Sequence, residues 1–408
     1  MSAARLRVLE LGRWLTLLGL FSVPINKPAT NIALFLALLC ALLGPEVRER
    51  FMVAIRQPVV LGCAGWFVVL ALFSLRSSDP LDSIGTYKAL LYPLLVATLL
   101  TTQDWRNRGL SAFGAAVTLV LLASWAQLFG LLPAREITNT FEAFRYTVFK
   151  DYTQQGLQFL MLASLAAAFA FVDTRPRVRI ALWCLAAAAF ANVAFLLQSR
   201  TAYLSIACLI VYGSWRVYSA RGRSLRTLLT GLLLIAILIG AAALTPRVQE
   251  RMEAAEQDIA QYTTQNVPTS LGIRLELWRR TLTIAAAAPW FGHGLGEWGR
   301  EYTRQTRDLP DFEPFRMGHP HQEALLMLAE IGAVGLGMMI ILLIMLARYM
   351  RSLPQPQRDF YLCLLLIYVS AGLANCLVLD FVHRHGFLLL LACIPAGPAL
   401  LKRSTAAA

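Results

Sequence analysis

Two histidines, His319 and His321, end a long hydrophilic stretch and lead directly into an apolar segment. A neutral imidazole accepts a proton from a hydroxyl near neutral pH, so His321 is a candidate general base. We expect Pro320 in the first turn of the following helix, where the helix dipole favours a neutral His321 ring. Glu323 acts in the opposite direction, so the sequence leaves the net pKa shift open.

Three basic residues stand where the chain is expected to leave the membrane. Arg200 lies in such a short connection that its guanidinium must sit at the membrane interface. Arginine at this depth is costly and usually faces a polar cavity, and its planar fork binds phosphate with two hydrogen bonds. We therefore predict an anion clamp at Arg200, with a lipid-facing anchor as the alternative. Arg145 and Lys150 are either weaker anion-binding residues or ordinary interfacial charges.

Other histidines on the same side leave two questions open. The pair His319 and His321 could hold a metal only with a third ligand such as His293, and no Asp-x-Asp pair accompanies them, so we predict no metal. We predict no cofactor and no nucleotide, since a P-loop is absent from the sequence. His383 and His385 either take part or anchor the chain at the interface.

Composition assigns the chain to the integral membrane proteins. Of its 408 residues, 57% are hydrophobic, and its mean hydropathy is +0.58. The apolar runs are continuous and long enough to cross a bilayer, which predicts an all-α polytopic fold. We expect twelve spans, centred near Leu17, Leu36, Val68, Leu94, Leu121, Ser164, Ala187, Ala207, Leu234, Met338, Leu365 and Leu390.

The distribution of basic residues predicts the orientation, because cytoplasmic loops carry the excess of Lys and Arg. One side holds Arg5, Arg7, Arg48, Arg50, Arg56, Arg106, Arg108, Arg175, Arg177, Arg179, Arg216, Arg221, Arg223, Arg226, Arg348, Arg351, Arg358, Lys402 and Arg403. The short loops of the other side hold only Lys27, Arg76, Arg135, Arg145, Lys150, Arg200 and Arg384. Both termini should be cytoplasmic. The net charge of +13 then faces the anionic leaflet of the lipid bilayer and implies no nucleic-acid partner.

Three parts follow along the chain: spans one to nine (1–244), a large hydrophilic loop (245–320), and spans ten to twelve with a tail (321–408). Thr245 and Pro246 should open a charged helix that ends near Tyr262. Ser270 should cap a second, amphipathic helix that lies along the membrane surface. The glycine-rich run 292–296 marks either a tight turn or a phosphate cradle.

Five short motifs, at residues 198–204, 273–278, 292–296, 319–326 and 329–335, together resemble the O-antigen ligase family of bacterial lipopolysaccharide assembly. In order and placement the resemblance covers nearly the whole chain. The motifs are degenerate one by one, and the set is fairly specific for the superfamily. Gln322 departs from the family, which commonly has Asn after the second histidine.

The resemblance implies transfer of a polysaccharide from undecaprenyl pyrophosphate to a sugar hydroxyl of the lipid A-core, at the periplasmic face of the inner membrane. A metal-independent, inverting displacement would follow. Arg200 and Arg274 would stabilise the leaving pyrophosphate, and His321 would accept the hydroxyl proton.

Residues around these three would bind substrate: Arg145, Lys150, His319 and Gln322. An O-antigen polymerase or a protein O-glycosyltransferase of the same superfamily, and a lipid-carrier transporter, are the alternatives. The sugars at either end of the new bond and the oligomeric state stay open.

Overall fold

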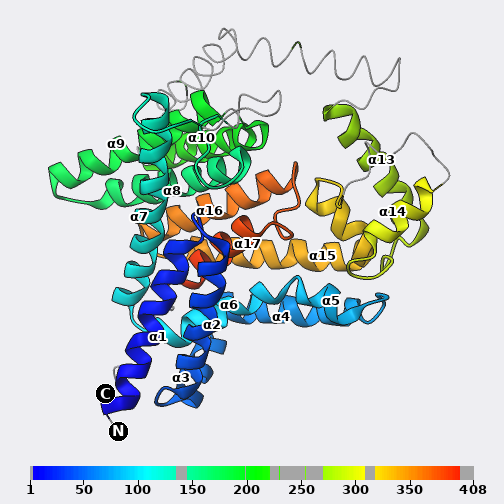
Figure 1. Ribbon diagram of the computed structural model, residues 1–408, viewed down its shortest axis with the longest axis horizontal. Helices are drawn as coiled ribbons and strands as arrows, with labels where there is room; N and C mark the ends of the chain where they lie inside the picture. Colours follow the sequence, from blue (N-terminus) through cyan, green and yellow to red (C-terminus); the bar gives the residue numbers. More distant parts are fainter. Residues whose placement is uncertain are drawn as a thin grey trace.

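The computed structural model describes residues 3–134, 145–197, 199–220, 270–307 and 318–395, with the isolated positions 229 and 253. Within these ranges every regular element is helical, as the composition predicted (Figure 1). The first helices are α1 (Ala3–Ser22), α2 (Lys27–Leu43), α3 (Val47–Ile55), α4 (Pro58–Ser74), α5 (Pro80–Gly85), η1 (Lys88–Leu91), α6 (Tyr92–Leu99) and α7 (Gln103–Leu128). The others are α8 (Tyr152–Val172), α9 (Pro176–Asn192), η3 (Val193–Leu197), α10 (Arg200–Ala220), α13 (Ser270–Ala287), α14 (Trp298–Thr306), α15 (Glu323–Arg351), α16 (Gln357–Gly372) and α17 (Phe381–Ala392).

Each predicted span centre lies in a helix, except Leu234, which falls outside the described residues, as does the helix expected from Thr245 to Tyr262. Four segments are long and apolar enough to cross a membrane: α7, α8, α9 with η3 (176–197), and α15. The pair α2 and α3, bent by 117°, would be a fifth. The all-helical membrane class is therefore confirmed, and the count of twelve spans stays a prediction.

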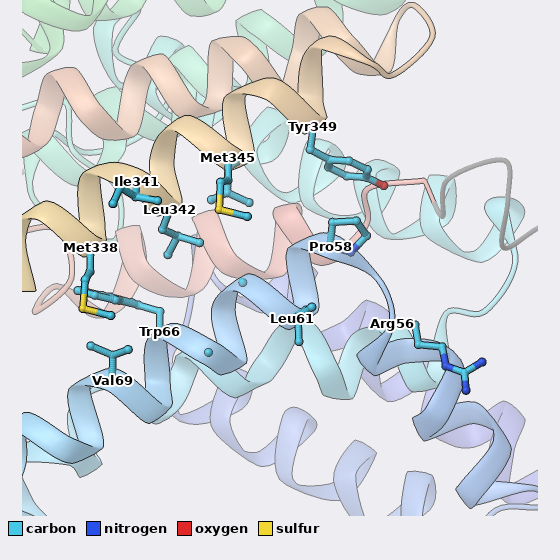
Figure 2. A pocket seen from close by; sticks show the side chains of 13 residues that line it. Arg56, Pro58, Leu61, Trp66, Val69, Met338, Ile341, Leu342, Met345 and Tyr349 are labelled. Carbon is cyan, nitrogen blue, oxygen red and sulfur yellow. The ribbon is translucent and has the colours of Figure 1, made fainter.

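Figure 2 shows a groove of about 500 Å³ between α4 and α15, lined by apolar side chains such as Trp66, Met338 and Leu342. Arg56 lies at one end of this groove. A groove of this composition offers no group that could move a proton or bind a phosphate along most of its length. This groove is therefore not a candidate for the predicted proton transfer and phosphate binding.

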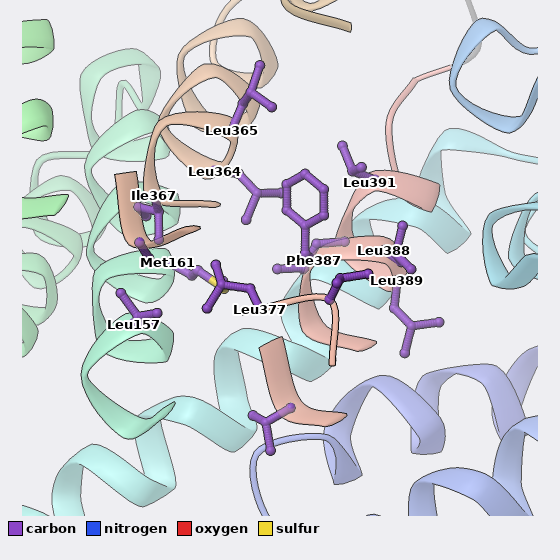
Figure 3. Close-up of a cluster of buried hydrophobic side chains, with 14 of the residues drawn as sticks. Leu157, Met161, Leu364, Leu365, Ile367, Leu377, Phe387, Leu388, Leu389 and Leu391 are labelled. Atoms are coloured by element: carbon purple, nitrogen blue, oxygen red, sulfur yellow. The ribbon is translucent and has the colours of Figure 1, made fainter. Parts of the chain in front are cut away.

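The core is centred on α17, which contacts α6, α8, α1, α4 and α16. Its side chain Phe387 lies among leucines of α16 and α17, and Leu157 and Met161 of α8 border the same cluster (Figure 3). Almost every residue of α17 is buried. A helix of only twelve residues is thus held by its neighbours, and residues at its first turn are placed by the whole bundle.

The glycine-rich run 292–296 forms a turn that is hydrogen-bonded to α15 where that helix is interrupted. Gly332 has φ 68° and interrupts the helix, and the backbone N–H groups of His293 and Gly294 donate to the carbonyls of Ala329 and Glu330 at 3.0 and 2.9 Å. A Cβ at Gly292 would lie 2.3 Å from the Glu330 carbonyl, so only glycine fits. These two N–H groups already have protein acceptors, which favours the tight turn over the phosphate cradle.

Arg76 and Glu297 tie this turn to the loop between α4 and α5. The Arg76 guanidinium donates to the Gly292 carbonyl at 3.1 Å, and the Glu297 carboxylate accepts from the hydroxyl of Ser77 and the backbone N–H of Ser78. Arg76, which the charge distribution assigned to the same predicted side as Arg200, therefore has a structural partner.

Candidate active site

The turn that carries the two histidines differs from the expectation for Pro320. Helix α15 begins at Glu323, and Gln322 is its N-cap, with a side-chain oxygen that accepts the Leu325 N–H. Pro320 therefore precedes the helix, because His321 adopts φ 53° and cannot continue it backwards. A non-glycine residue in this left-handed region stores roughly 1–3 kcal/mol of strain, which is most often found at functional sites.

The two imidazoles lie against each other beside α13. Their ring centroids are 4.2 Å apart, and the backbone N–H of His321 donates to the Nδ1 atom of His319 at 3.2 Å. Trp278 of α13 donates its indole N–H to the Pro320 carbonyl at 3.0 Å. Helix α13 was predicted from its amphipathic pattern, and this hydrogen bond shows how it holds the histidine turn; its position on a membrane surface stays a prediction.

The His321 ring is kept neutral mainly by burial. Burial, with smaller contributions from the nearby His319 and Arg274, lowers the pKa of His321 to about 4. Glu323 was expected to raise the pKa of His321, but it does not contribute to the shift. Its carboxylate instead accepts hydrogen bonds from the Tyr368 hydroxyl and the Leu377 N–H, each at 3.0 Å. A base that is neutral over the physiological range is the form that accepts a proton.

Arg200 is the first residue of α10, and it lies half-buried beside the start of α8. Ser199 precedes it and donates to the Thr153 hydroxyl of α8 at 3.3 Å. Helix N-termini carry unpaired N–H groups and a partial positive charge, so they attract anions. The sequence predicted an anion-binding guanidinium at Arg200. The structure places the N-termini of α8 and α10 beside it, and both favour an anion.

Arg274 of α13 approaches both Arg200 and His321. Burial lowers the pKa of Arg274; the neighbouring Tyr152 acts in the opposite direction, and Arg200 lowers it again. Among the described residues, neither guanidinium forms an ion pair with a carboxylate. Arg274 thus lies within electrostatic range of both other predicted catalytic residues, and both guanidiniums are partly buried.

Lys150 lies near Asp380, a residue that the predicted site did not include. Burial lowers the pKa of Lys150, while the nearby Asp380 raises it. Asp380 is the N-cap of α17 and also counteracts the effect of burial on His319. Its side chain accepts from Gln154 of α8 and from the backbone N–H of His383. An Asp three residues before a helical His is a capping signal that could have pointed to it.

Arg145 is exposed, with its guanidinium carbon 5.8 Å from the Tyr146 ring centre, and its role stays a prediction. The same holds for Gln322, whose amide oxygen serves as the helix cap. A shorter Asn is the commoner residue at such caps, so the departure from the family pattern changes how the cap is made and leaves the turn in place.

The remaining histidines have structural surroundings. His293 Nε2 lies 2.9 Å from the Ile284 carbonyl, so this ring is turned toward α13. Within the described ranges, no three His, Cys, Asp or Glu residues gather as a metal-binding group. His383 and His385 are both buried, which argues against interfacial anchors. His385 contacts the Phe381 carbonyl at 2.7 Å, and Arg384 donates to the carbonyls of Thr86 and Val378.

Asn375 carried no functional signal in the sequence, and its partner Thr201 stood there only as part of the motif at 198–204. The Asn375 amide donates to the Thr201 hydroxyl at 2.8 Å, and the same side chain contacts the His321 ring. Asn375 lies in the irregular connection between α16 and α17. No spacing in the sequence relates it to residue 321.

Comparison with known proteins bears on this group of residues. Residues 185–340 match the family model described as O-antigen ligase. No curated protein matches the chain. The matched region contains Arg200, Arg274, His319 and His321 together with the glycine-rich turn. The resemblance to the O-antigen ligase family that the motifs indicated is therefore confirmed, and residues 185–340 carry its domain.

Proposed function

We propose that this protein is an O-antigen ligase that moves a polysaccharide from undecaprenyl pyrophosphate to a sugar hydroxyl of the lipid A-core. One observation supports this most strongly: two arginines without carboxylate partners among the described residues lie beside a neutral histidine at the N-termini of α8 and α10. That combination matches a reaction in which a diphosphate leaves while a hydroxyl loses its proton.

In the proposed reaction, the acceptor oxygen attacks the anomeric carbon as the bond to the pyrophosphate oxygen breaks. His321 takes the hydroxyl proton. Arg200 and Arg274 stabilise the charge that grows on the pyrophosphate, and fixed cations in a partly buried site do this far better than ions in water. Lys150, with Asp380 beside it, lies within the same group, and Arg145 stays a proposed helper. The reaction inverts the anomeric carbon and needs no metal.

His321→Ala tests the base, with purified protein reconstituted in lipid vesicles that contain donor and acceptor. We expect transfer to fall by about 10²- to 10⁴-fold, the usual contribution of general-base catalysis. Binding of the carrier should persist, since its charge is met by arginine. His293→Ala is the matched control, because that ring is bound to the α13 carbonyl. If a chelator abolished wild-type transfer and added zinc or magnesium restored it, the metal-free mechanism would be wrong.

The periplasmic orientation can be tested with two exposed arginines. Arg300 of α14 and Arg175 before α9 have 65% and 73% of their side chains exposed. In spheroplasts, Arg300→Cys should react with an impermeant thiol reagent, and Arg175→Cys should react only after lysis. The parent protein, with its seven native cysteines, gives the background. The reverse pattern would invert the topology and move the site to the cytoplasm.

The alternative acceptors are separated by deletion of the gene and analysis of the lipopolysaccharide. A ligase defect leaves polymer of normal length on the carrier. A polymerase defect instead caps the core with single repeats, and an intact lipopolysaccharide would favour a protein acceptor or a transporter.

A further inference from the structure

The connection between α16 and α17 wraps around the turn that carries His321. The Leu377 N–H donates to the Glu323 carboxylate at 3.0 Å, and the Tyr368 hydroxyl donates to the other oxygen of the same carboxylate. The Cys376 thiol lies at the backbone N–H groups of His321 and Gln322. Tyr368 before Asn375, and Cys376 and Leu377 after it, therefore hold this part of the chain against the histidine turn.

The orientation of the Asn375 amide follows from its partner on α10. Its nitrogen donates to the Thr201 hydroxyl at 2.8 Å, and Thr201 is almost fully buried. This leaves the amide oxygen, an acceptor, as the atom that meets the His321 ring. An acceptor at one ring nitrogen holds the proton there and leaves the other nitrogen with a free lone pair.

The amide contact is assigned to Nε2 of His321, because Nδ1 is the buried ring nitrogen that lacks a hydrogen-bond partner among the residues that the structure describes. A buried nitrogen without a partner is costly unless a substrate supplies one. An acceptor hydroxyl would do so, by donating its hydrogen to Nδ1.

We propose that Asn375 is a positioning residue: its amide oxygen binds the Nε2–H of His321 and thereby presents Nδ1 to the acceptor hydroxyl. The hydroxyl proton moves to Nδ1 as its oxygen bonds to the anomeric carbon, and the electron pair of the broken bond leaves with the pyrophosphate. Thr201 follows Arg200 in the first turn of α10, so the same amide connects the base to the helix that begins with the donor clamp. This inference rests on the proposed function.

Replacing Asn375 by Asp tests the tautomer, because Asp has nearly the same shape and replaces the amide by a carboxylate. The groups facing His321 are His319 and Arg274, which lower its pKa, and Asn375, which raises it. A carboxylate raises the pKa further, so imidazolium persists to higher pH. We expect transfer by Asn375→Asp to fall at least tenfold at about pH 6 and to recover toward wild type at about pH 8.5. Asn107→Asp in α7 is the matched control and should leave the pH profile unchanged.

Asn375→Ala removes the acceptor altogether. We expect kcat to fall by about tenfold or more at every pH, with KM for the lipid-linked donor little changed, because the base is misplaced and the donor clamp is intact. Thr201→Val and Thr201→Ser separate the hydroxyl from side-chain size. The Val variant should lose activity, since the amide can rotate, and the Ser variant should keep it.

Equal losses for Asn375→Asp at pH 6 and 8.5, or full activity of Asn375→Ala, would overturn this role. These results are distinct from failure of the proposed function, because that would appear as an active His321→Ala variant. Should Asn375→Ala fail to fold, Asn375→Asp and the Thr201 pair still decide the question through the pH profile and the serine rescue.

Discussion

Arginines at the two ends of the helix bundle meet opposite helix termini. Arg50 donates to the carbonyls of Ala41 and Thr98, near the C-termini of α2 and α6, and Arg106 donates to those of Leu100 and Ile394. C-terminal carbonyls lack helical partners and carry partial negative charge, so they accept hydrogen bonds from a guanidinium. At this end the chain's own carbonyls stabilise its arginines.

The other end reverses this arrangement. Arg200 opens α10 beside the start of α8, where the helix dipoles are positive, and Arg274 adds a second cation. Neither of these two arginines forms an ion pair with a carboxylate in the part of the chain that the structure describes. The comparison teaches that helix-end carbonyls hold Arg50 and Arg106 in place, whereas Arg200 and Arg274 lie beside helix starts and have no described carboxylate partner.

The largest effect is expected where carbonyls hold the arginines. Arg106→Ala leaves the Leu100 and Ile394 carbonyls and the Gln57 amide oxygen without their donor, at about 1–3 kcal/mol for each buried acceptor. Purified protein should then unfold at a markedly lower temperature in detergent or fail to accumulate. Arg108→Ala on the same helix is the control, because Arg108 is exposed. Equal melting temperatures for the two variants would remove the structural role of Arg106.

Arg200→Lys should affect catalysis and spare folding. Lysine keeps the charge but loses the planar fork that grips a phosphate with two hydrogen bonds. We expect transfer to fall by about 10²-fold, the usual cost of losing one donor to a developing negative charge. Initial rates and melting temperature should be measured on the same preparation. A fully active Lys variant would reduce Arg200 to an interfacial anchor.

Arg274→Ala should change the pH profile as well as the rate. The pKa of His321, about 4, keeps the base neutral in the wild type, so transfer should vary little between about pH 8 and pH 5. Loss of Arg274 removes a neighbouring positive charge and admits water, and both raise that pKa. The acid limb of the residual activity should therefore move to higher pH. An unmoved limb would show that Arg274 does not act on His321.

The smallest effect is expected for Arg175, which lies at a helix start but in the open. It pairs with Asp173 at 2.8 Å and is largely exposed to solvent. Arg175→Ala should change neither the melting temperature nor the transfer rate, because exposed ion pairs contribute little to stability. A drop in activity would mean that burial is not what separates the two classes of arginine.

The sequence alone indicated the all-helical membrane class, and it selected the residues proposed for catalysis. Continuous apolar runs can cross a membrane only as helices, so hydropathy indicated where helices lie. Motif spacing selected Arg200, Arg274 and His321 because charge and proton affinity belong to the residue type. These properties need no tertiary context.

Tertiary structure decided how these residues are placed and what surrounds them. The left-handed His321, the cap at Gln322 and the low pKa of the ring depend on packing between segments far apart in the chain. Asn375 meets Thr201 across 174 positions of sequence, and such a contact has no local pattern. Burial and the direction of a lone pair arise only when helices from both halves of the chain close around one turn.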